Sequence, residues 1–336
     1  MSNLDIFRIY YRRLVSYVKL KKVVTEGNYS YVNWIFNGRT PYNWFANFIN
    51  YNFGKVNYPI RFYSVFGNKR HLEEKFSGVK IFFTPENLEK HTIYFKEDLI
   101  NNKTGWYLSE IYRQYKDFAL RDMDLSIGFS NLEKNNYIRV PLWIIIFFKP
   151  DSNYNDIKEQ VEVINKSKCY VNARNAVVIA SHDDFGLRNK ICCDVEKIIP
   201  ITYAGKWKNT TNELWEKYKN DKELYLKNFK FNICAENMNA PYYVTEKLFD
   251  AFKSGIIPIY HGANNNPEPN IINKNRIIFW DFKGDNYENI KLLKKLQSDD
   301  NFYYKYVSQT KLLNESVDLI YDKFEELRKK LEIILK

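Results

Sequence analysis

The hydrophobic positions form short apolar runs that alternate with polar turns and amphipathic stretches, a pattern typical of an α/β protein. Apolar runs bounded by polar residues predict buried strands, and apolar residues at helical spacing predict helices. The predicted strands are residues 31–36, 60–67, 79–83, 125–129, 176–181, 199–205, 229–234, 256–260 and 276–280. The predicted helices are residues 42–53, 187–195, 206–228, 245–254, 286–307 and 309–335, with a partly helical connection at 150–168.

Residues 229–262 carry the most informative pattern. A buried strand leads into an Asn-rich turn at 236–239, then into a helix that begins at Thr245 and ends at Ser254-Gly255, then into a second strand. This order is a βαβ unit, in which ligands bind beyond the carboxyl ends of the strands and at helix N-termini. We therefore expect a ligand at the turn and at the start of this helix.

Two charged residues open that helix. Lys247 lies in the first turn, where the helix macrodipole disfavours a cation unless an anion such as phosphate binds beside it. Glu246 is suited to accept hydrogen bonds from ribose hydroxyls. The alternative, that Thr245 and Glu246 only cap the helix and that Lys247 is solvated, stays open on the pattern alone.

This segment resembles the donor-binding signature of the α-1,3/4-fucosyltransferases, glycosyltransferase family 10. The matching residues are Phe229, Phe231, Glu236, Asn237, the run Tyr243-Val244-Thr245-Glu246-Lys247, the run Ile257-Pro258-Ile259-Tyr260, and Gly262. The similarity extends over residues 75–285. It implies an α/β fold of the GT-B type, with two Rossmann-like domains facing across a cleft.

The resemblance also implies a division of labour between domains. Residues 1–155 form the expected N-terminal, acceptor-binding domain, and residues 156–310 the expected GDP-fucose-binding domain. Residues 311–336 read as a C-terminal amphipathic helix that packs back on the body.

Glu86 is the expected catalytic base. It stands in Thr84-Pro85-Glu86-Asn87, directly after a predicted strand, and this sequence also has the form of a helix start. In α/β proteins, ligand-binding and catalytic residues lie at the carboxyl ends of the strands, and Glu86 has such a position. The family has a similar turn whose Glu is the presumed general base, and the resemblance carries that role to Glu86.

The other expected site residues follow from the resemblance. The donor-binding set is Arg188, Asn237, Tyr243, Glu246 and Lys247, with Arg188 and Lys247 taking the charge of the pyrophosphate. Asp124 and Trp34 are the candidates that face the acceptor, and a purely structural role for Asp124 is the alternative.

No metal ligand is predicted. Asp122-Met123-Asp124 matches the DxD pattern of metal-dependent transferases, but that pattern is short and common, and the family has an Asp only at the position of Asp124. With two cations for the diphosphate, no cofactor is obligatory. Stimulation by Mn²⁺ or Mg²⁺ stays open.

Composition limits the remaining classes. The chain has 336 residues, 45% of them hydrophobic, which is enough for two α/β domains. The net charge of +11 admits nucleic acid or an anionic membrane, but the lysines are scattered, and we expect no nucleic-acid partner. The four cysteines have no zinc or disulfide spacing, and we expect reduced thiols.

The expected location is cytoplasmic. Arg8, Arg12 and Arg13 interrupt any signal-peptide core, and the longest apolar run, residues 140–148, is too short to span a bilayer. Residues 2–24 form a predicted basic amphipathic helix. This helix or residues 311–336 could contact the inner face of an anionic membrane, and packing on the body of the protein is the favoured alternative.

The expected reaction is inverting transfer of L-fucose from GDP-fucose to a hydroxyl of GlcNAc in an oligosaccharide acceptor. The linkage is α-1,3, with α-1,4 left open, in a glycan such as a lipopolysaccharide O-antigen or a Lewis-type structure. Two alternatives remain: a GT-B transferase that uses another nucleotide sugar, and a non-enzymatic basic binding protein.

Overall fold

The computed structural model describes residues 23–36, 41–88, 112–170, 172–183 and 186–336. It divides into two compact units. Unit 1 contains Met1–Asn153 and Ile320–Lys336, and unit 2 contains Tyr154–Leu319. The predicted boundary lies after residue 155, two residues later than the observed one. The C-terminal residues 320–336 are part of unit 1.

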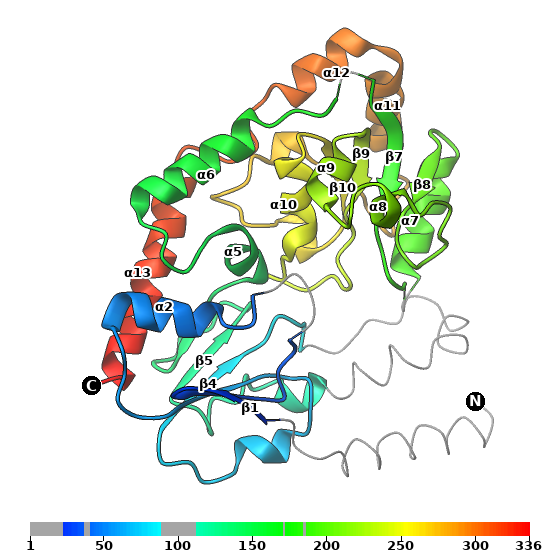
Figure 1. The fold of residues 1–336 in the computed structure, drawn as a ribbon. Coiled ribbons are helices and arrows are strands. Elements are labelled where there is room, and N and C mark those ends of the chain that lie inside the picture. Colours follow the sequence, from blue (N-terminus) through cyan, green and yellow to red (C-terminus); the bar gives the residue numbers. More distant parts are fainter. Residues whose placement is uncertain (1–22, 37–40, 89–111, 171, 184–185) are drawn as a thin grey trace, which may run out of the picture. The chain divides into compact units, whose positions relative to one another are not determined.

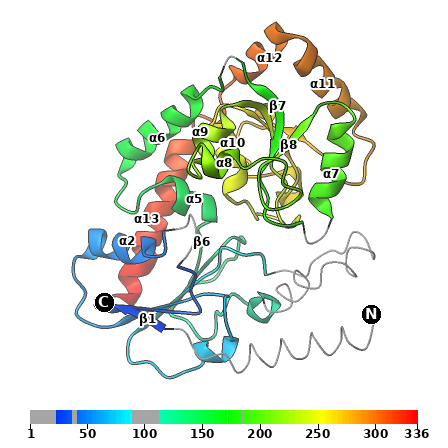
Figure 2. The ribbon, with the colours of Figure 1, turned by 45° about the vertical axis from the view of Figure 1, so that its right-hand side comes forward.

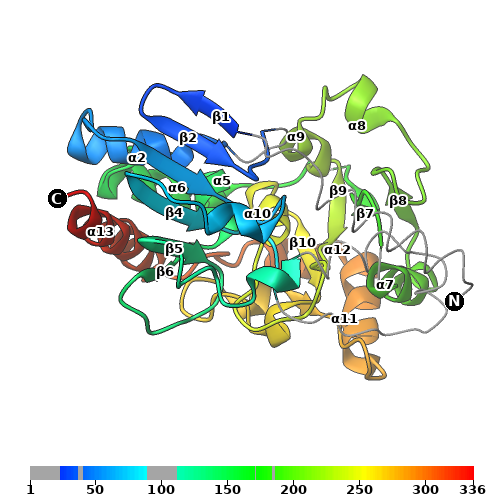
Figure 3. The same ribbon diagram turned by 90° about the horizontal axis from the view of Figure 1, so that it is seen from below.

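Unit 1 is built on a six-stranded sheet in the order β1-β2-β3-β4-β5-β6. Its strands are β1 (Val23–Glu26), β2 (Tyr29–Val32), β3 (Ile60–Tyr63), β4 (Val79–Phe83), β5 (Leu125–Gly128) and β6 (Tyr137–Arg139). β1 and β2 form an antiparallel hairpin, and every later pair is parallel. Figure 3 shows the hairpin at one edge of the sheet and β5 and β6 toward the other. The predicted 2–24 helix is wrong at its end, because residues 23 and 24 begin β1; residues 1–22 lie outside the described part.

The helices of unit 1 carry aromatic side chains into its core. They are α2 (Trp44–Phe53), η1 (Lys69–Leu72), η2 (Arg113–Tyr115), α5 (Leu142–Phe147) and most of α13 (Ser316–Ile334). Figure 2 shows α13 next to α2. Phe324 on α13 packs against Trp44 and Phe48 on α2, with ring centroids 5.7 and 5.9 Å apart. Phe324, Leu327 and Leu331 are all buried. The apolar stripe of α13 therefore packs inside the protein, as the favoured alternative predicts, and the structure gives no support to a membrane contact through it.

Unit 2 is a parallel five-stranded sheet in the order β11-β10-β9-β7-β8. Its strands are β7 (Arg174–Val178), β8 (Ile201–Tyr203), β9 (Phe229–Ile233), β10 (Ile257–Tyr260) and β11 (Ile278–Phe279). Its helices are α6 (Tyr154–Lys166), α7 (Leu187–Glu196), α8 (Glu213–Glu216), α9 (Lys222–Leu226), α10 (Glu246–Lys253), η3 (Ala263–Asn265), η4 (Lys274–Arg276), α11 (Tyr287–Ser298) and α12 (Asp300–Val307). Apolar runs such as Ile257–Tyr260, which is buried at every position, suit strands that are covered on both faces. Figure 1 shows α10 beside β10.

Several predicted helices differ from the structure. Residues 286–307 form two helices, α11 and α12, instead of one. Residues 84–88 form a non-helical loop, because the Thr84 hydroxyl both accepts from the Glu86 N–H and donates to the Glu86 carbonyl, 3.1 and 2.9 Å away. The Lys- and Asn-rich stretch 206–228 contains only the short helices α8 and α9. Within the described ranges, no helix is long and apolar enough to cross a membrane.

Candidate active site

The carboxyl edge of the unit 2 sheet brings together the loops after β7 and β9 and the N-termini of α7 and α10. The Arg188 guanidinium on α7 donates from Nη2 to Asn237 Oδ1 at 2.5 Å, in the loop after β9. Arg188 also lies close enough to Lys247 on α10 for its charge to act on that lysine's pKa. Three of the five residues expected to bind the donor therefore gather at one edge, as ligand sites of α/β sheets do.

Glu236 connects the elements of this edge through its hydrogen bonds. Its side chain is completely buried, and its carboxylate accepts from the Thr245 N–H at 2.8 Å and from the Thr245 hydroxyl at 2.7 Å. Lys247 Nζ lies 3.2 Å from the same carboxylate. A buried carboxylate is costly unless such partners satisfy it. Glu236 thus fixes the start of α10 against the end of β9.

Lys247 points into the network with part of its side chain still accessible. Nζ donates to Glu236 Oε2 and, at 3.0 Å, to Thr245 Oγ1, and 22% of the side chain is exposed. Burial alone would lower the pKa of Lys247, but Glu236 and Glu246 outweigh it and the pKa is raised. The side chain therefore stays charged at neutral pH. An ammonium group has three donors, so one remains for a ligand.

Thr245 occupies the N-cap position of α10, as predicted, but its side chain makes no cap hydrogen bond. The hydroxyl donates to Glu236 instead. The N-terminus of α10 is therefore not closed by its own N-cap side chain, and a helix N-terminus of this kind favours an anion.

Arg188 is almost completely enclosed. It is 6% exposed, and its guanidinium donates to the His182 carbonyl at 2.5 Å as well as to Asn237. Asp183 accepts from the backbone N–H of Arg188 and of Asn189, so it caps α7. Residues 184 and 185 of this loop lie outside the described part. Arg188 supplies positive charge and holds the Asn237 loop in place.

The two other expected donor residues flank the network. Tyr243 is 2% exposed, in the loop that leads to α10, and Glu246 is the first residue of α10 and half-buried. Glu246 acts on Lys247 through its charge, because it is one of the two carboxylates that raise the lysine's pKa.

The surroundings of Gly262 explain why the signature ends in a glycine. The φ of Gly262 is +153°, and a Cβ there would lie 2.6 Å from Glu236 Cγ and 2.8 Å from the Tyr260 hydroxyl oxygen. Behind it, the His261 carbonyl accepts from the Glu236 N–H at 2.9 Å. Glycine is required here because the backbone passes directly beneath the buried glutamate.

Glu86 lies at the carboxyl edge of the unit 1 sheet, three residues after the end of β4. The start of its loop is held from both sides: the Ser64 hydroxyl donates to the Phe83 carbonyl at 2.7 Å, and the Thr84 N–H donates to the Ile127 carbonyl at 3.1 Å. The Glu86 side chain is half-buried. A partly accessible carboxylate on a fixed loop has the placement that a general base needs.

Trp34 follows β2 at the same edge of unit 1. Its ring lies 6.0 Å from that of Phe83, the last residue of β4. Asn33, also at this edge, has a positive φ of 54° and lies 3.1 Å, through Oδ1, from Nδ1 of the buried His71. A Cβ on Gly67 would come within 2.1 Å of Asn33 Oδ1, so this corner is tightly packed.

Asp124 lies at the opposite edge of unit 1. It precedes β5, and its carboxylate accepts from the Lys80 N–H at 2.8 Å, near the start of β4. This contact ties two strands together and matches the structural alternative. Among the residues that the structure describes, no three His, Cys, Asp or Glu side chains gather as a metal site.

Sequence reasoning left two site residues without a role. Glu236 stood in the signature, but its partner Thr245 is nine residues away, and only the fold brings them together. Asp183 stood in the predicted loop, where an Asp shortly before a helix is a usable capping signal.

Comparisons with known proteins match both units to one family. The model described as glycosyltransferase family 10 (fucosyltransferase) C-term matches residues 166–324. The model described as alpha-(1,3)-fucosyltransferase FucT N-terminal domain matches residues 42–146.

Two curated relatives and two crystal structures are similar to the chain. It is 28% identical to alpha-(1,3)-fucosyltransferase FucT of Helicobacter pylori over 66% of this chain and 47% of that protein. It is 24% identical to alpha-(1,3)-fucosyltransferase B of Drosophila melanogaster over 60% of this chain and 42% of that protein. The chain thus spans less than half the length of either relative.

The solved structures share the fold. A crystal structure of an alpha1,3-fucosyltransferase with GDP-fucose has a TM-score of 0.51 and 21% identity, over 82% of this chain and 78% of that one. A second crystal structure of an alpha1,3-fucosyltransferase has a TM-score of 0.52 and 20% identity, over 84% of this chain and 79% of that one. The fold is therefore of the GT-B type, with a mostly parallel sheet in unit 1 and a parallel sheet in unit 2. By both family models, the chain belongs to glycosyltransferase family 10.

Proposed function

We propose that the chain is a GDP-fucose-dependent α-1,3-fucosyltransferase, which moves L-fucose to a hydroxyl of GlcNAc with inversion at the anomeric carbon. The observation that carries this proposal is the network of Glu236, Thr245 and Lys247 beside Arg188 and Asn237. It places two cations and the N-terminus of α10 at one sheet edge. This is the chemistry that a diphosphate requires.

In the proposed reaction, Glu86 accepts the proton of the acceptor hydroxyl while that oxygen attacks the anomeric carbon of fucose. The bond from this carbon to the diphosphate oxygen breaks, and GDP leaves with the electron pair. A positioned base contributes about 10²- to 10⁴-fold to such a step. Lys247 and Arg188 stabilise the charge that develops on the leaving diphosphate.

The remaining residues orient the donor. Glu246, in the first turn of α10, accepts hydrogen bonds from the ribose, and Asn237 and Tyr243 border the sugar and phosphates. Trp34 offers an aromatic face to the acceptor beside the Glu86 loop. No step needs a metal, and the effect of Mn²⁺ or Mg²⁺ is settled by assay with and without a chelator.

The α-1,3 linkage is supported by the names of the similar proteins, and the donor by the GDP-fucose bound to one of the similar structures. The acceptor is an oligosaccharide that contains GlcNAc, as in a Lewis-type structure or a lipopolysaccharide O-antigen.

The test is a transfer assay with GDP-fucose and a panel of lactose, N-acetyllactosamine and type 1 acceptors, with products identified by NMR. We expect a fucosylated GlcNAc with an α-1,3 linkage, and no product from GDP-mannose. Transfer from GDP-mannose in preference to GDP-fucose would assign a different donor. An α-1,4 product would correct the regiochemistry alone.

A further inference from the structure

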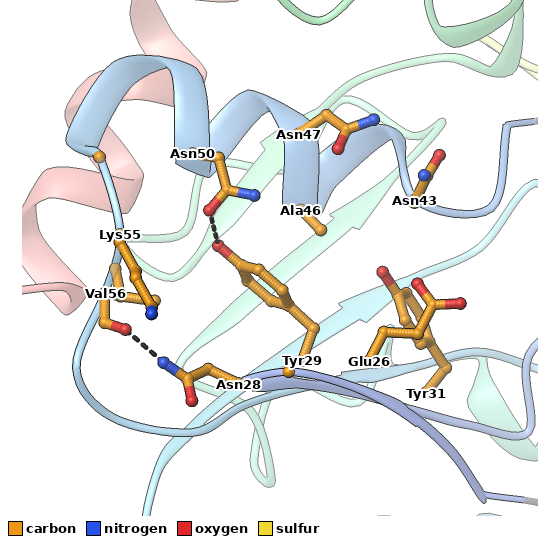
Figure 4. Close-up of a pocket in the computed structure, with 12 residues that line it drawn as sticks. Glu26, Asn28, Tyr29, Tyr31, Asn43, Ala46, Asn47, Asn50, Lys55 and Val56 are labelled. Atoms are coloured by element: carbon orange, nitrogen blue, oxygen red, sulfur yellow. Dashed lines mark hydrogen bonds between the residues drawn. The ribbon is translucent and has the colours of Figure 1, made fainter.

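A groove with both polar and apolar lining residues lies in unit 1, away from the catalytic loop described above. It runs between α2 and the β1–β2 hairpin and has a volume of about 600 Å³. That volume is within the usual range of ligand pockets. Figure 4 shows side chains of both elements facing the groove.

The wall formed by α2 is lined with asparagines. Asn43, Asn47 and Asn50 all belong to it, and Asn28 lies across from them in the hairpin turn. The Tyr29 hydroxyl donates to Asn50 Oδ1 at 2.6 Å (Figure 4). Each amide carries both donors and an acceptor, so this wall matches a ligand whose groups also donate and accept.

The buried hydroxyl of Tyr31 indicates that the groove binds a ligand. Tyr31 is 1% exposed, and its hydroxyl has no hydrogen-bond partner in the described part of the chain. Buried hydroxyls are normally hydrogen-bonded, and an unpaired one costs free energy. In Figure 4 this hydroxyl is directed toward α2, on the same side as that of Tyr29. A ligand hydroxyl in the groove would satisfy it.

The charges of the groove balance. Glu26 and Lys55, one carboxylate and one ammonium group, are both exposed at its border. Glu26 Oε1 accepts from the Tyr42 hydroxyl at 2.7 Å. A lining without net charge favours a neutral ligand over a phosphate or an acidic peptide.

We propose that this groove binds a neutral oligosaccharide. Sugar hydroxyls donate and accept, as the asparagine amides do, and the apolar face of a sugar ring packs on Tyr29, Ala46 and Val56, which also line the groove. α2 has ten residues and is about 15 Å long, which accommodates more than one sugar ring.

The groove is separate from the catalytic loop but leads toward the same edge of unit 1. Asn28 precedes β2, whose four residues span about 13 Å. At the far end, the Tyr31 ring lies 5.6 Å from that of Trp34. A glycan along β2 therefore has one end beside Trp34. On the proposed function, this makes the groove a subsite for distal sugars of the acceptor.

The experiment is NMR of the ¹⁵N-asparagine-labelled full chain, titrated with a neutral N-acetyllactosamine tetrasaccharide without GDP-fucose. We expect side-chain amide signals to shift, among them the signal that Asn47→Ala removes. Tyr31→Phe should lower the affinity about 5- to 10-fold, the effect of one lost hydrogen bond, without lowering the melting temperature. The matched control is Asn52→Ala, since Asn52 lies on α2 but bonds to the Phe48 carbonyl instead of lining the groove.

Three results would overturn the proposal: unmoved signals of the groove asparagines, full affinity in Tyr31→Phe, or equal loss in Asn52→Ala and Asn47→Ala. A response to a peptide but not to the tetrasaccharide also overturns it. The groove and the proposed function fail separately. If fucose is transferred but the asparagine signals do not shift, only the proposal for the groove is refuted. If the signals shift but no fucose is transferred, only the proposed transferase activity is refuted.

Discussion

Two glutamates occupy equivalent places in the two units and have opposite surroundings. Glu86 stands three residues after the end of β4, and Glu236 three residues after the end of β9, each at the carboxyl edge of a parallel sheet. Glu236 is completely buried and bonded to Thr245 and Lys247, whereas Glu86 is half-buried on a loop. Position at a strand end therefore does not decide a carboxylate's role. The two differ in burial: Glu236 is completely enclosed by its partners, and Glu86 is partly accessible.

The largest expected effect comes from the accessible glutamate. Glu86→Gln removes the proposed base, so turnover should fall by about 10²- to 10⁴-fold. Melting temperature and GDP affinity should not change, since Glu86 belongs to neither the core nor the nucleotide edge. Steady-state kinetics with GDP-fucose and calorimetry measure the two. Near-normal turnover would remove Glu86 from the mechanism, and a large loss of stability would show that it, too, is structural.

The buried glutamate should behave in the reverse way. Glu236→Ala leaves Lys247 without its buried counter-charge and Thr245 without its acceptor, so the free energy of unfolding should fall by about 3–5 kcal/mol. Denaturant titration measures this, with Glu246→Ala, a half-buried neighbour, as the comparison. A loss as small as that of Glu246→Ala would contradict the role of Glu236 in connecting the elements of this edge.

These two carboxylates also mark what the sequence can and cannot predict. The apolar runs predicted β4 at residues 79–83 and the βαβ unit at 229–262, because a buried strand leaves a pattern in residues that are consecutive in the sequence. The helix start at Thr84 was wrong for residues 84–88, which form a loop in which the Thr84 hydroxyl donates to the Glu86 carbonyl. The role of Glu236 depends on Thr245 and on the His261 carbonyl, contacts that no local pattern contains.

Arg188 shows the same limit. Its place at a helix start was readable from the sequence, but its enclosure was not, because it depends on the His182 carbonyl and on Asn237 in another loop. Side-chain accessibility is a property of the packed edge and not of any one segment.

A smaller change tests the packing around Glu236. Gly262→Ala places a Cβ 2.6 Å from Glu236 Cγ, and such overpacking costs about 1–3 kcal/mol. The matched control is Gly54→Ala: Gly54 also has a positive φ, +71°, but nothing lies within 4 Å of the added Cβ. Only Gly262→Ala should also weaken GDP binding. Equal effects of the two variants on stability and on GDP binding would show that Gly262 is needed only for its backbone conformation and not for its packing against Glu236.

The last comparison concerns two lysines of unit 2. Lys247 has carboxylate neighbours and a raised pKa, whereas Lys311 is 1% exposed, and burial, aided by the charge of Arg276, lowers its pKa to about 7. In the unfolded chain the Lys311 pKa is about 10.4, so between pH 7 and that value the unfolded chain binds more protons than the folded chain. Stability should therefore rise with pH across this window.

The Lys311→Met variant isolates that contribution. Wild-type melting temperature, measured from pH 6.5 to pH 9, should rise relative to the variant's. Parallel curves would show that Lys311 keeps its ordinary pKa. The variant also loses the two hydrogen bonds from Nζ to the Asn165 and Ser167 carbonyls, which lowers its stability at every pH but does not change the slope.

The central claim is that the edge organised by Glu236 binds a diphosphate through Lys247. Calorimetric titration of GDP into the wild type, Lys247→Ala and Lys253→Ala tests it most directly. Lys253 is at the other end of α10 and pairs with Glu223, so its loss is a control for charge and for the helix. We predict that Lys247→Ala weakens GDP binding by about 10- to 100-fold, the effect of a lost charge-assisted hydrogen bond, and that Lys253→Ala does not. Unchanged affinity in Lys247→Ala, or an equal loss in both variants, would contradict the account.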